Sequence, residues 1–226
     1  MLFESADPDY FLAHWDLADD GSLLADHPPQ VEGQAPFSDL VIRLSKLPVL
    51  TVSAIRGRVR GAGSEFVLAT DIRFASRERA VLGQFEITAG VIPGGGAVAR
   101  LPRLVGRARA LEIMAGGEDF DGALAERYGY VNRAVPDAEF DAFIDAFVTR
   151  VSGFSVSAIR ELKGEVNPQT LPKDDELAAQ SDLFFAALAT PEVQEWAKQA
   201  FENGLQQVGP FEEDLAEHSA KYAPKR

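Results

Sequence analysis

The stretch Gly57-Arg58-Val59-Arg60-Gly61-Ala62-Gly63-Ser64-Glu65 joins an apolar, β-rich run over 49–55 to a short helical segment over 64–70. Its glycines stand where a strand should end, and Glu65 falls in the first turn of the expected helix. Backbone N–H groups at such a junction point outward together, so they can stabilise a negative oxygen while the helix dipole adds to the field. The stretch predicts an α/β unit with an oxyanion-binding turn.

Strands and helices alternate on both sides of this stretch. Expected strands cover 2–3, 49–55, 72–75, 80–83 and 130–134, and expected helices cover 37–44 and 64–70. Apolar residues within 18–36 recur with no regular spacing, so this segment is expected to form a loop. From Gly106 onward the apolar residues recur almost entirely with helical spacing. We therefore predict an α/β core with parallel strands over 1–135, followed by a helical region over 136–226.

An apolar stripe with helical spacing lies near the carboxyl end of the chain. It consists of Val193, Trp196, Ala197, Ala200, Phe201 and Leu205. Such a stripe must be buried against another surface. Its own domain or a second subunit could provide that surface, and the pattern fits both equally.

The amino-acid composition and net charge argue against several classes of function. The 226 residues carry a formal net charge of −13, which opposes binding to nucleic acid or to anionic membranes. The chain has no cysteine and only three histidines, so it is expected to hold no metal, disulfide or catalytic thiol. The amino terminus is acidic, and no apolar run reaches the roughly 18 residues of a membrane span. These features predict a cytoplasmic protein.

Three other glycine-containing motifs do not match this stretch, because each requires a residue that the stretch lacks. A dinucleotide-binding fingerprint needs glycine where Phe66 stands, and a phosphate-binding loop needs a Gly-Lys-Ser/Thr sequence that the stretch lacks. A nucleophile elbow needs glycine two residues after Ser64, where Phe66 again stands.

Two glutamates remain as candidate acid and base. Glu65 alone is an ordinary helix-start residue, and Glu86 is expected at a strand end or in a loop, where a solvated carboxylate is common. Each lies beside a glycine-rich turn, so together they can bracket a small reacting group and divide the acid and base roles.

The order and spacing of these segments resemble the enoyl-CoA hydratase/isomerase (crotonase) family. The matching motifs include Gly61-Ala62-Gly63-Ser64-Glu65, Gly83-Gln84-Phe85-Glu86 and Gly90-Val91-Ile92-Pro93-Gly94-Gly95-Gly96, within the matched segments 47–57, 61–65, 71–76, 83–86, 90–96, 100–106, 108–110 and 125–132. The resemblance implies a crotonase-like (ClpP/crotonase) spiral of ββα units with a helical carboxyl-terminal region that forms homotrimers or homohexamers. It also implies an acyl-CoA thioester substrate and no separate cofactor.

The resemblance also assigns roles to residues. The family's oxyanion hole of two backbone N–H groups maps onto Ala62 and Trp15. Alanine at position 62 is acceptable if its φ is negative. The residues implied in substrate or CoA binding are Ala13, His14, Asp16, Gly61, Gly94 and Phe201.

Both catalytic positions of the family's hydratases are filled, by Glu65 and Glu86. This favours addition of water to a 2-enoyl-CoA through an oxyanion-stabilised enolate. One alternative is an isomerase that uses Glu86 alone, and another is a non-catalytic, homo-oligomeric binding protein of the same fold.

The chain departs from the family pattern at three places. Phe85 stands where proline commonly precedes the second glutamate and can re-aim Glu86. The family begins with a strand, hairpin and helix, so the resemblance predicts that about 30 residues or more are missing and that strand edges are left unpaired. The family's Lys-Arg pair after Phe201 is replaced by Glu202-Asn203. Arg56, Arg58 and Arg60 either supply positive charge in its place or form a solvated strand face.

Overall fold

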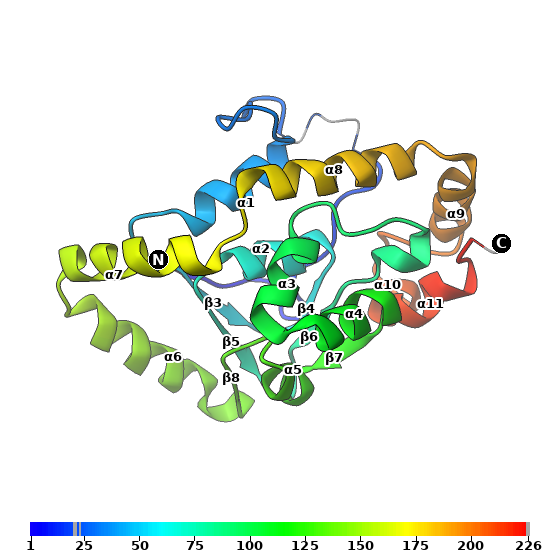
Figure 1. The fold of residues 1–226 in the computed structure, drawn as a ribbon. Helices are drawn as coiled ribbons and strands as arrows, with labels where there is room; N and C mark the ends of the chain where they lie inside the picture. The colour runs from blue at the N-terminus through cyan, green and yellow to red at the C-terminus, as the bar shows by residue number, and fades with distance from the viewer. Residues whose placement is uncertain (20–21, 23, 225–226) are drawn as a thin grey trace.

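Two four-stranded sheets form the centre of the computed structural model, which describes residues 1–19, 22 and 24–224 (Figure 1). One sheet has the order β1-β3-β5-β8 (Leu2–Phe3, Val52–Ile55, Ile72–Ser76 and Arg133–Val135). The other has the order β2-β4-β6-β7 (Tyr10–Leu12, Arg58–Arg60, Val81–Gly83 and Asp119–Asp121). Neighbouring strands are parallel except β6 and β7. From β1 to β6 successive strands alternate between the sheets, so the chain winds as a spiral.

Helices surround the two sheets. They are α1 (Pro36–Ser45), α2 (Ala62–Ala69), α3 (Ala97–Val105), α4 (Arg107–Gly116), α5 (Gly122–Tyr128), α6 (Asp137–Ser152), α7 (Val156–Thr170), α8 (Asp174–Leu188), α9 (Pro191–Glu202), α10 (Pro210–Glu213) and α11 (Leu215–Lys221), with a 3₁₀ helix η1 (Glu86–Ala89). Helix α8 lies alongside α1 and leads to α9, while α6 and α7 extend at the opposite end of the molecule (Figure 1). This return of the chain brings α8 and α9 back over the α/β core.

The carboxyl-terminal stripe is buried by its own chain. Val193, Trp196, Ala200 and Leu205 pack in one cluster with Phe85, Ala89, Val91, Phe211 and Leu215. Helix α9 ends at Glu202, yet Leu205 continues into the same cluster from the following turn. The surface that covers the stripe is therefore η1 together with α10 and α11.

Most of the predicted elements are present, with local differences. Strands β2 and β7 were not expected, because three residues are too few to establish an alternation. Glu86 begins η1 rather than ending a strand. The expected loop over 18–36 ends one residue early, because Pro36 is the first residue of α1. Residues 20, 21 and 23 of this loop lie outside the described part of the chain.

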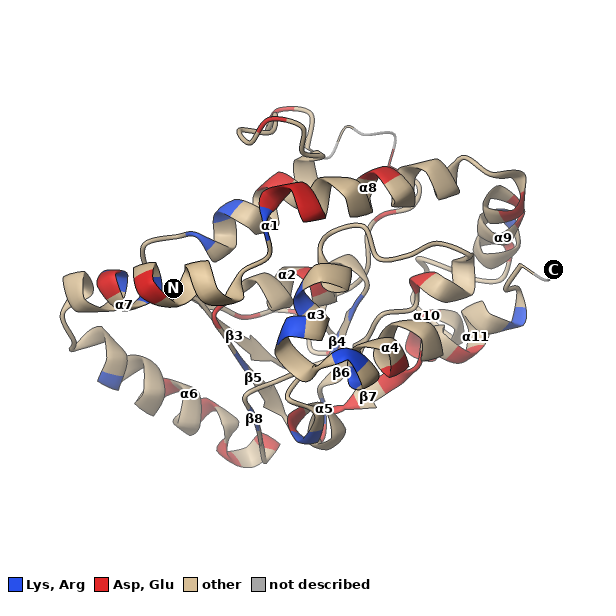
Figure 2. Cartoon of the chain, viewed as in Figure 1, with Lys and Arg blue, Asp and Glu red and all other residues tan. Residues whose placement is uncertain are grey.

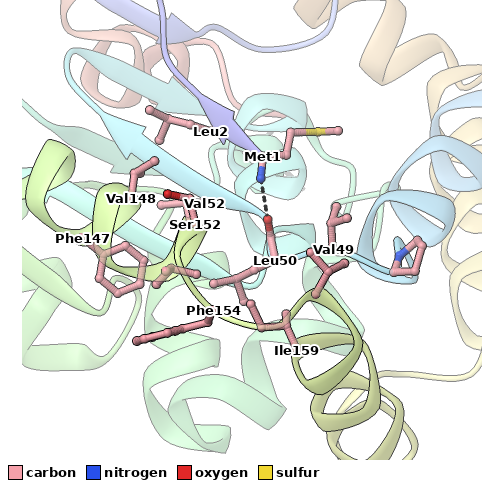
Figure 3. Close-up of a pocket in the computed structure, with 13 residues that line it drawn as sticks. Met1, Leu2, Val49, Leu50, Val52, Phe147, Val148, Ser152, Phe154 and Ile159 are labelled. Carbon is pink, nitrogen blue, oxygen red and sulfur yellow. Dashed lines mark hydrogen bonds between the residues drawn. The ribbon is translucent and has the colours of Figure 1, made fainter.

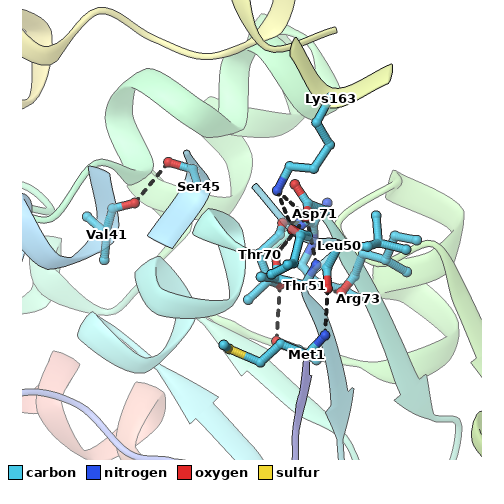
Figure 4. Close-up of polar contacts among 12 residues, drawn as sticks. Met1, Val41, Ser45, Leu50, Thr51, Thr70, Asp71, Arg73 and Lys163 are labelled. Atoms are coloured by element: carbon cyan, nitrogen blue, oxygen red, sulfur yellow. Dashed lines mark hydrogen bonds and ion pairs between the residues drawn. The ribbon is translucent and has the colours of Figure 1, made fainter. Parts of the chain in front are cut away.

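A partly buried ion pair between Lys163 and Asp71 connects α7 to the first sheet (Figure 4). The Lys163 ammonium donates to Asp71 Oδ2 at 2.7 Å and to the Val49 carbonyl at 2.8 Å. Asp71 Oδ2 also accepts from the Thr51 backbone N–H at 2.7 Å. One carboxylate thus links the helical region to the segments that enter β3 and β5.

An apolar groove of about 170 Å³ lies beside this pair, between the amino terminus and the α6–α7 hairpin (Figure 3). At its edge the Met1 amino group donates to the Leu50 carbonyl at 2.7 Å, and its walls include Val49, Phe147, Phe154 and Ile159.

Acidic side chains are spread over many helices, and the first turn of α8 holds Asp174, Asp175 and Glu176 (Figure 2). Among the described residues, no single helix has the length and apolar composition of a membrane span. Helices α6 and α7 meet those criteria only as a pair, and the pair is bent by 101°.

Candidate active site

A cavity of about 450 Å³ opens between the α/β core and helices α8 and α9. Nine of the ten predicted site residues line it, namely His14, Trp15, Asp16, Gly61, Ala62, Glu65, Glu86, Gly94 and Phe201. Segments far apart in the sequence therefore meet at one place: the loop after β2, the start of α2, η1, the turn before α3, and α9.

Ala13 is the predicted site residue that does not line the cavity. A Cβ added to Gly63 would lie 2.4 Å from the Ala13 carbonyl oxygen and 2.0 Å from that of Leu12. These carbonyls thus press against the first turn of α2, where only glycine fits. The contact places the loop that carries Trp15 beside the start of α2, and Ala13 belongs to that contact rather than to the cavity wall.

The turn before α2 requires glycine at position 61. Gly61 has a φ of 50°, and a Cβ there would lie 3.0 Å from the Phe85 ring and 3.2 Å from Glu86 Oε1. Ala62 is the first residue of α2, and N–H groups in the first helical turn have no acceptor within the helix. Its φ is not positive, so alanine fits without strain and keeps the N–H. The Ala62 N–H can therefore serve as an oxyanion donor.

Glu65 is 3% exposed and is held by the turn that opens α3. Its Oε1 atom accepts hydrogen bonds from the Gly95 N–H at 2.7 Å and the Ala97 N–H at 3.0 Å. Burial raises the pKa of Glu65 to about 7, against the opposing effect of these N–H groups and of Arg100. The carboxyl group can therefore exchange a proton near neutral pH.

Glu86 is 7% exposed at the start of η1. Burial raises its pKa well above 4.5, and the negative charge of Glu65 raises it further. With its nitrogen turned toward Glu86, the Gln84 amide donates to the two carboxyl oxygens at 2.9 and 3.0 Å and accepts from Ser64 at 2.9 Å. Two buried carboxyl groups with unequal proton affinity can act as a base and an acid.

Aromatic side chains form much of the cavity wall. The Trp15 and Phe37 rings meet edge to face with centroids 5.6 Å apart, and Phe184 packs directly against Gly94. Phe85, which stands in place of the family's proline, is buried beneath the site and contacts His14 edge to face. The wall is suited to an apolar part of a ligand.

Known proteins share this architecture. A family model described as enoyl-CoA hydratase/isomerase matches residues 2–208. The chain belongs to this family. A curated relative, the "Probable enoyl-CoA hydratase echA8" of Mycobacterium bovis, is 35% identical over 154 residues. That match covers 68% of this chain and 60% of the relative, so the chain spans about 60% of the length of the curated relatives it matches.

Solved structures confirm the crotonase fold. A "putative enoyl-CoA hydratase" of Streptomyces avermitilis is 44% identical, with a TM-score of 0.92 over 96% of this chain and 79% of the other. An enoyl-CoA hydratase of Mycobacterium avium subsp. paratuberculosis is 28% identical, with a TM-score of 0.70 over 78% and 70% of the two chains. The predicted family and fold are therefore both correct.

The three arginines proposed as a source of positive charge do not line the cavity of this family member. Arg56 pairs with Asp137 at 2.8 Å, and Arg58 donates to the Glu213 carbonyl at 3.0 Å. Arg60 is buried and pairs with Asp119, so the expected solvated strand face is wrong for this residue. Lys198 on α9, which no sequence motif indicated, is the lysine that lines the cavity among the described residues.

Two further residues beside the site carried no sequence signal. Gln206 accepts from the Leu17 N–H at 2.7 Å and donates to Asp16 Oδ1 at 2.5 Å. Glu212 accepts from His14 Nε2 at 3.0 Å. About 190 residues separate these partners along the chain, so only the tertiary fold brings them together.

Proposed function

We propose that this chain is an enoyl-CoA hydratase, which adds water to a 2-enoyl-CoA thioester. The observation that carries the proposal is the pair of buried carboxyl groups, Glu65 and Glu86, in one cavity with the Ala62 and Trp15 backbone. An isomerase that moves a proton with Glu86 alone would not need Glu65 held between the Gly95 and Ala97 N–H groups. The intact pair supports hydration.

The reaction begins with polarisation of the thioester carbonyl by the Ala62 and Trp15 N–H groups. Water adds through its oxygen to the β-carbon, and the electrons of the double bond move to the thioester oxygen as an enolate. Oriented N–H donors at that oxygen stabilise the developing charge without reorganisation.

The two glutamates transfer the protons of the reaction. Glu65 has the lower pKa, because the Gly95 and Ala97 N–H groups and Arg100 favour its charged form, so it accepts the proton released by water. Glu86 has a pKa raised by burial and by Glu65, so it is protonated and donates to the α-carbon. A proton passed from Glu65 to Glu86 then restores the starting state, and one water molecule has been added in total.

The acyl group and the CoA phosphates of the substrate are expected to bind at different parts of the cavity, the aromatic wall and the rim. The apolar acyl group is expected against Trp15, Phe37 and Phe184. Lys198 on α9 is exposed at the rim and carries the charge that a CoA phosphate requires.

Hydration of crotonyl-CoA tests the proposal, followed by loss of the enoyl thioester absorbance. Glu65→Gln and Glu86→Gln are each expected to lower kcat by about 10²-fold or more, while the exposed control Glu161→Gln keeps full activity. Full hydration by either active-site variant would refute the two-carboxylate mechanism. A parent protein that binds the thioester without turnover would support the binding-protein alternative.

A further inference from the structure

The His14 ring beside the oxyanion loop is placed between two acceptors. Its Nδ1 atom lies 2.7 Å from the Trp15 carbonyl oxygen, and its Nε2 atom lies 3.0 Å from Glu212 Oε1. The side chains of His14 and Glu212 are only 6% and 7% exposed, so water does not compete for these contacts. A carbonyl oxygen can only accept, and Nδ1 must therefore donate.

Glu212 is held in its charged, accepting form. Its Oε1 atom also accepts from the Gln206 backbone N–H at 2.6 Å. Although burial opposes ionisation, the pKa of Glu212 lies below its ordinary value because His14, the Gln206 N–H and Arg60 favour the carboxylate. With acceptors at both ring nitrogens, His14 carries two protons and a positive charge.

Gln206 holds the same loop from a strained position. Among the described residues it is the only non-glycine residue with a positive φ, at 63°. Its side chain bonds to Asp16 and to the Leu17 N–H, and its backbone N–H bonds to Glu212. Such strain persists only where the surrounding structure enforces it, and it gathers at functional sites.

We propose that Glu212 and Gln206 are positioning residues which, with His14 as an imidazolium, clamp the loop over 14–17 and so fix the Trp15 N–H of the oxyanion hole. This inference rests on the proposed function, which assigns the Trp15 N–H to the thioester oxygen. The clamp adds a fixed positive charge next to the site where the enolate charge develops, which favours the enolate.

The titratable groups around His14 come from four elements. Glu212 belongs to α10, Asp16 to the loop itself and Arg60 to β4, where its guanidinium donates to the Glu212 carbonyl at 2.7 Å. Glu86 of η1 and His14 meet at Gly61, where an added Cβ would lie 3.2 Å from Glu86 Oε1 and 3.3 Å from the His14 Cβ. Glu86 is protonated and uncharged in the proposed reaction, so the carboxylates of Glu212 and Asp16 face the single Arg60 cation, and the surroundings favour the imidazolium.

Nuclear magnetic resonance of the histidine rings tests the charge without any substrate. In the intact chain, the His14 signals, assigned by their loss in His14→Gln, are expected to show both ring nitrogens protonated at neutral pH, because each nitrogen faces an acceptor. In Glu212→Gln the signals should show a single protonated nitrogen. A His14 ring with one protonated nitrogen in the parent would overturn the proposal.

A second measurement reads the oxyanion site directly. Acetoacetyl-CoA can bind as an enolate, which absorbs where the keto form does not. Glu212→Gln and Gln206→Gly should lower the bound enolate fraction by about tenfold or more. The neighbouring Gln207→Gly is the matched control and should leave this fraction unchanged.

The outcomes separate this inference from the proposed function. A protonated His14 with a clamp-dependent enolate signal, in a protein that hydrates no enoyl-CoA, would uphold the clamp and refute hydration. Hydration by a protein in which Glu212→Gln and Gln206→Gly leave the enolate fraction unchanged would refute the clamp alone. Thermal unfolding of each variant shows whether a lost signal comes from a lost fold.

Discussion

The Gly95 N–H donates to Glu65 Oε1 at 2.7 Å, and this hydrogen bond fixes the carboxyl group at the mouth of the turn that opens α3. A Cβ at Gly95 would lie 2.5 Å from Glu65 Oε2 and 2.4 Å from the Phe37 ring. The turn therefore binds Glu65 and has no space for a side chain at position 95. The precise aim of the proposed base depends on a residue that takes no part in the chemistry.

Gly95→Ala is expected to reduce kcat by about 10²-fold, because the added methyl group displaces Glu65 from its position beside the substrate. Gly164→Ala is the matched control, since a Cβ at Gly164 meets open space on α7. Steady-state hydration of crotonyl-CoA measures both. Parental activity in Gly95→Ala would contradict the proposed role of the turn.

Glu86→Gln is expected to stabilise the fold at neutral and alkaline pH. Because folding raises the pKa of Glu86, the folded state binds its proton more tightly than the unfolded state. The resulting stabilisation is fully present below about pH 4.5, the ordinary pKa, and is lost as the pH rises through the raised pKa. Thermal unfolding at about pH 8 should give the variant a Tm higher by about 2 °C or more, with the difference shrinking toward pH 5. An equal difference at both pH values would contradict the raised pKa.

Lys163→Met is expected to destabilise the fold by about 1.5–3 kcal/mol, since it removes the charged hydrogen bonds from Lys163 to the partly buried Asp71 carboxylate and to the Val49 carbonyl. Lys46→Met removes a more exposed ion pair with Asp174 and should cost less than about 1 kcal/mol. Urea unfolding of the two variants measures both values. Equal losses would show that the Lys163 pair does not anchor α7.

Lys198→Gln is expected to raise the KM for crotonyl-CoA by about tenfold with kcat unchanged, because a contact to a CoA phosphate is the same in substrate and transition state. Lys221→Gln, on α11 outside the cavity lining, is the control. The raised KM should diminish at high salt, where the charge contributes less. A fall in kcat with KM unchanged would place Lys198 in a different role.

The proposed homotrimer or homohexamer is expected to involve α7, which exposes Leu162 and Val166 one helical turn apart. Leu162→Glu with Val166→Glu should lower the mass measured by light scattering to that of one chain. Arg160→Glu adds acid to the same helix without removing apolar surface and should leave the mass unchanged. A double variant that keeps the parental mass would exclude this face.

Local patterns account for the parts of the fold that the sequence predicts. Apolar residues of α1, β3 and β5 recur with the period of their own element, and the glycines at 61 and 63 stand where their conformation or a close approach demands them. Their meaning can be read without the rest of the molecule. The sequence also indicates that Glu65 and Glu86 belong to one site, because each lies beside a glycine-rich turn: Glu65 follows the turn at 61–63, and Glu86 precedes the turn at 94–96.

The remaining features depend on packing between distant segments. The spacing of Val193 and Trp196 predicts a buried stripe but does not say that η1 and α11 cover it. The arginines at 56 and 60 look alike in sequence, and only the fold decides that Arg60 is buried against Asp119. Gln206 and Glu212 meet the loop at 14–17 across almost the whole chain, so no local pattern indicates their role.

The most direct test of the proposed hydratase activity follows the oxygen atom of water into the product. The parent protein is incubated with crotonyl-CoA in ¹⁸O-labelled water, and the product is analysed by mass spectrometry beside the Glu65→Gln variant. Hydration predicts a 3-hydroxyacyl-CoA that contains one ¹⁸O atom with the parent, and almost none with the variant. A parent that incorporates no ¹⁸O, yet converts a 3-enoyl-CoA to its 2-enoyl isomer equally well with and without Glu65, would contradict the account.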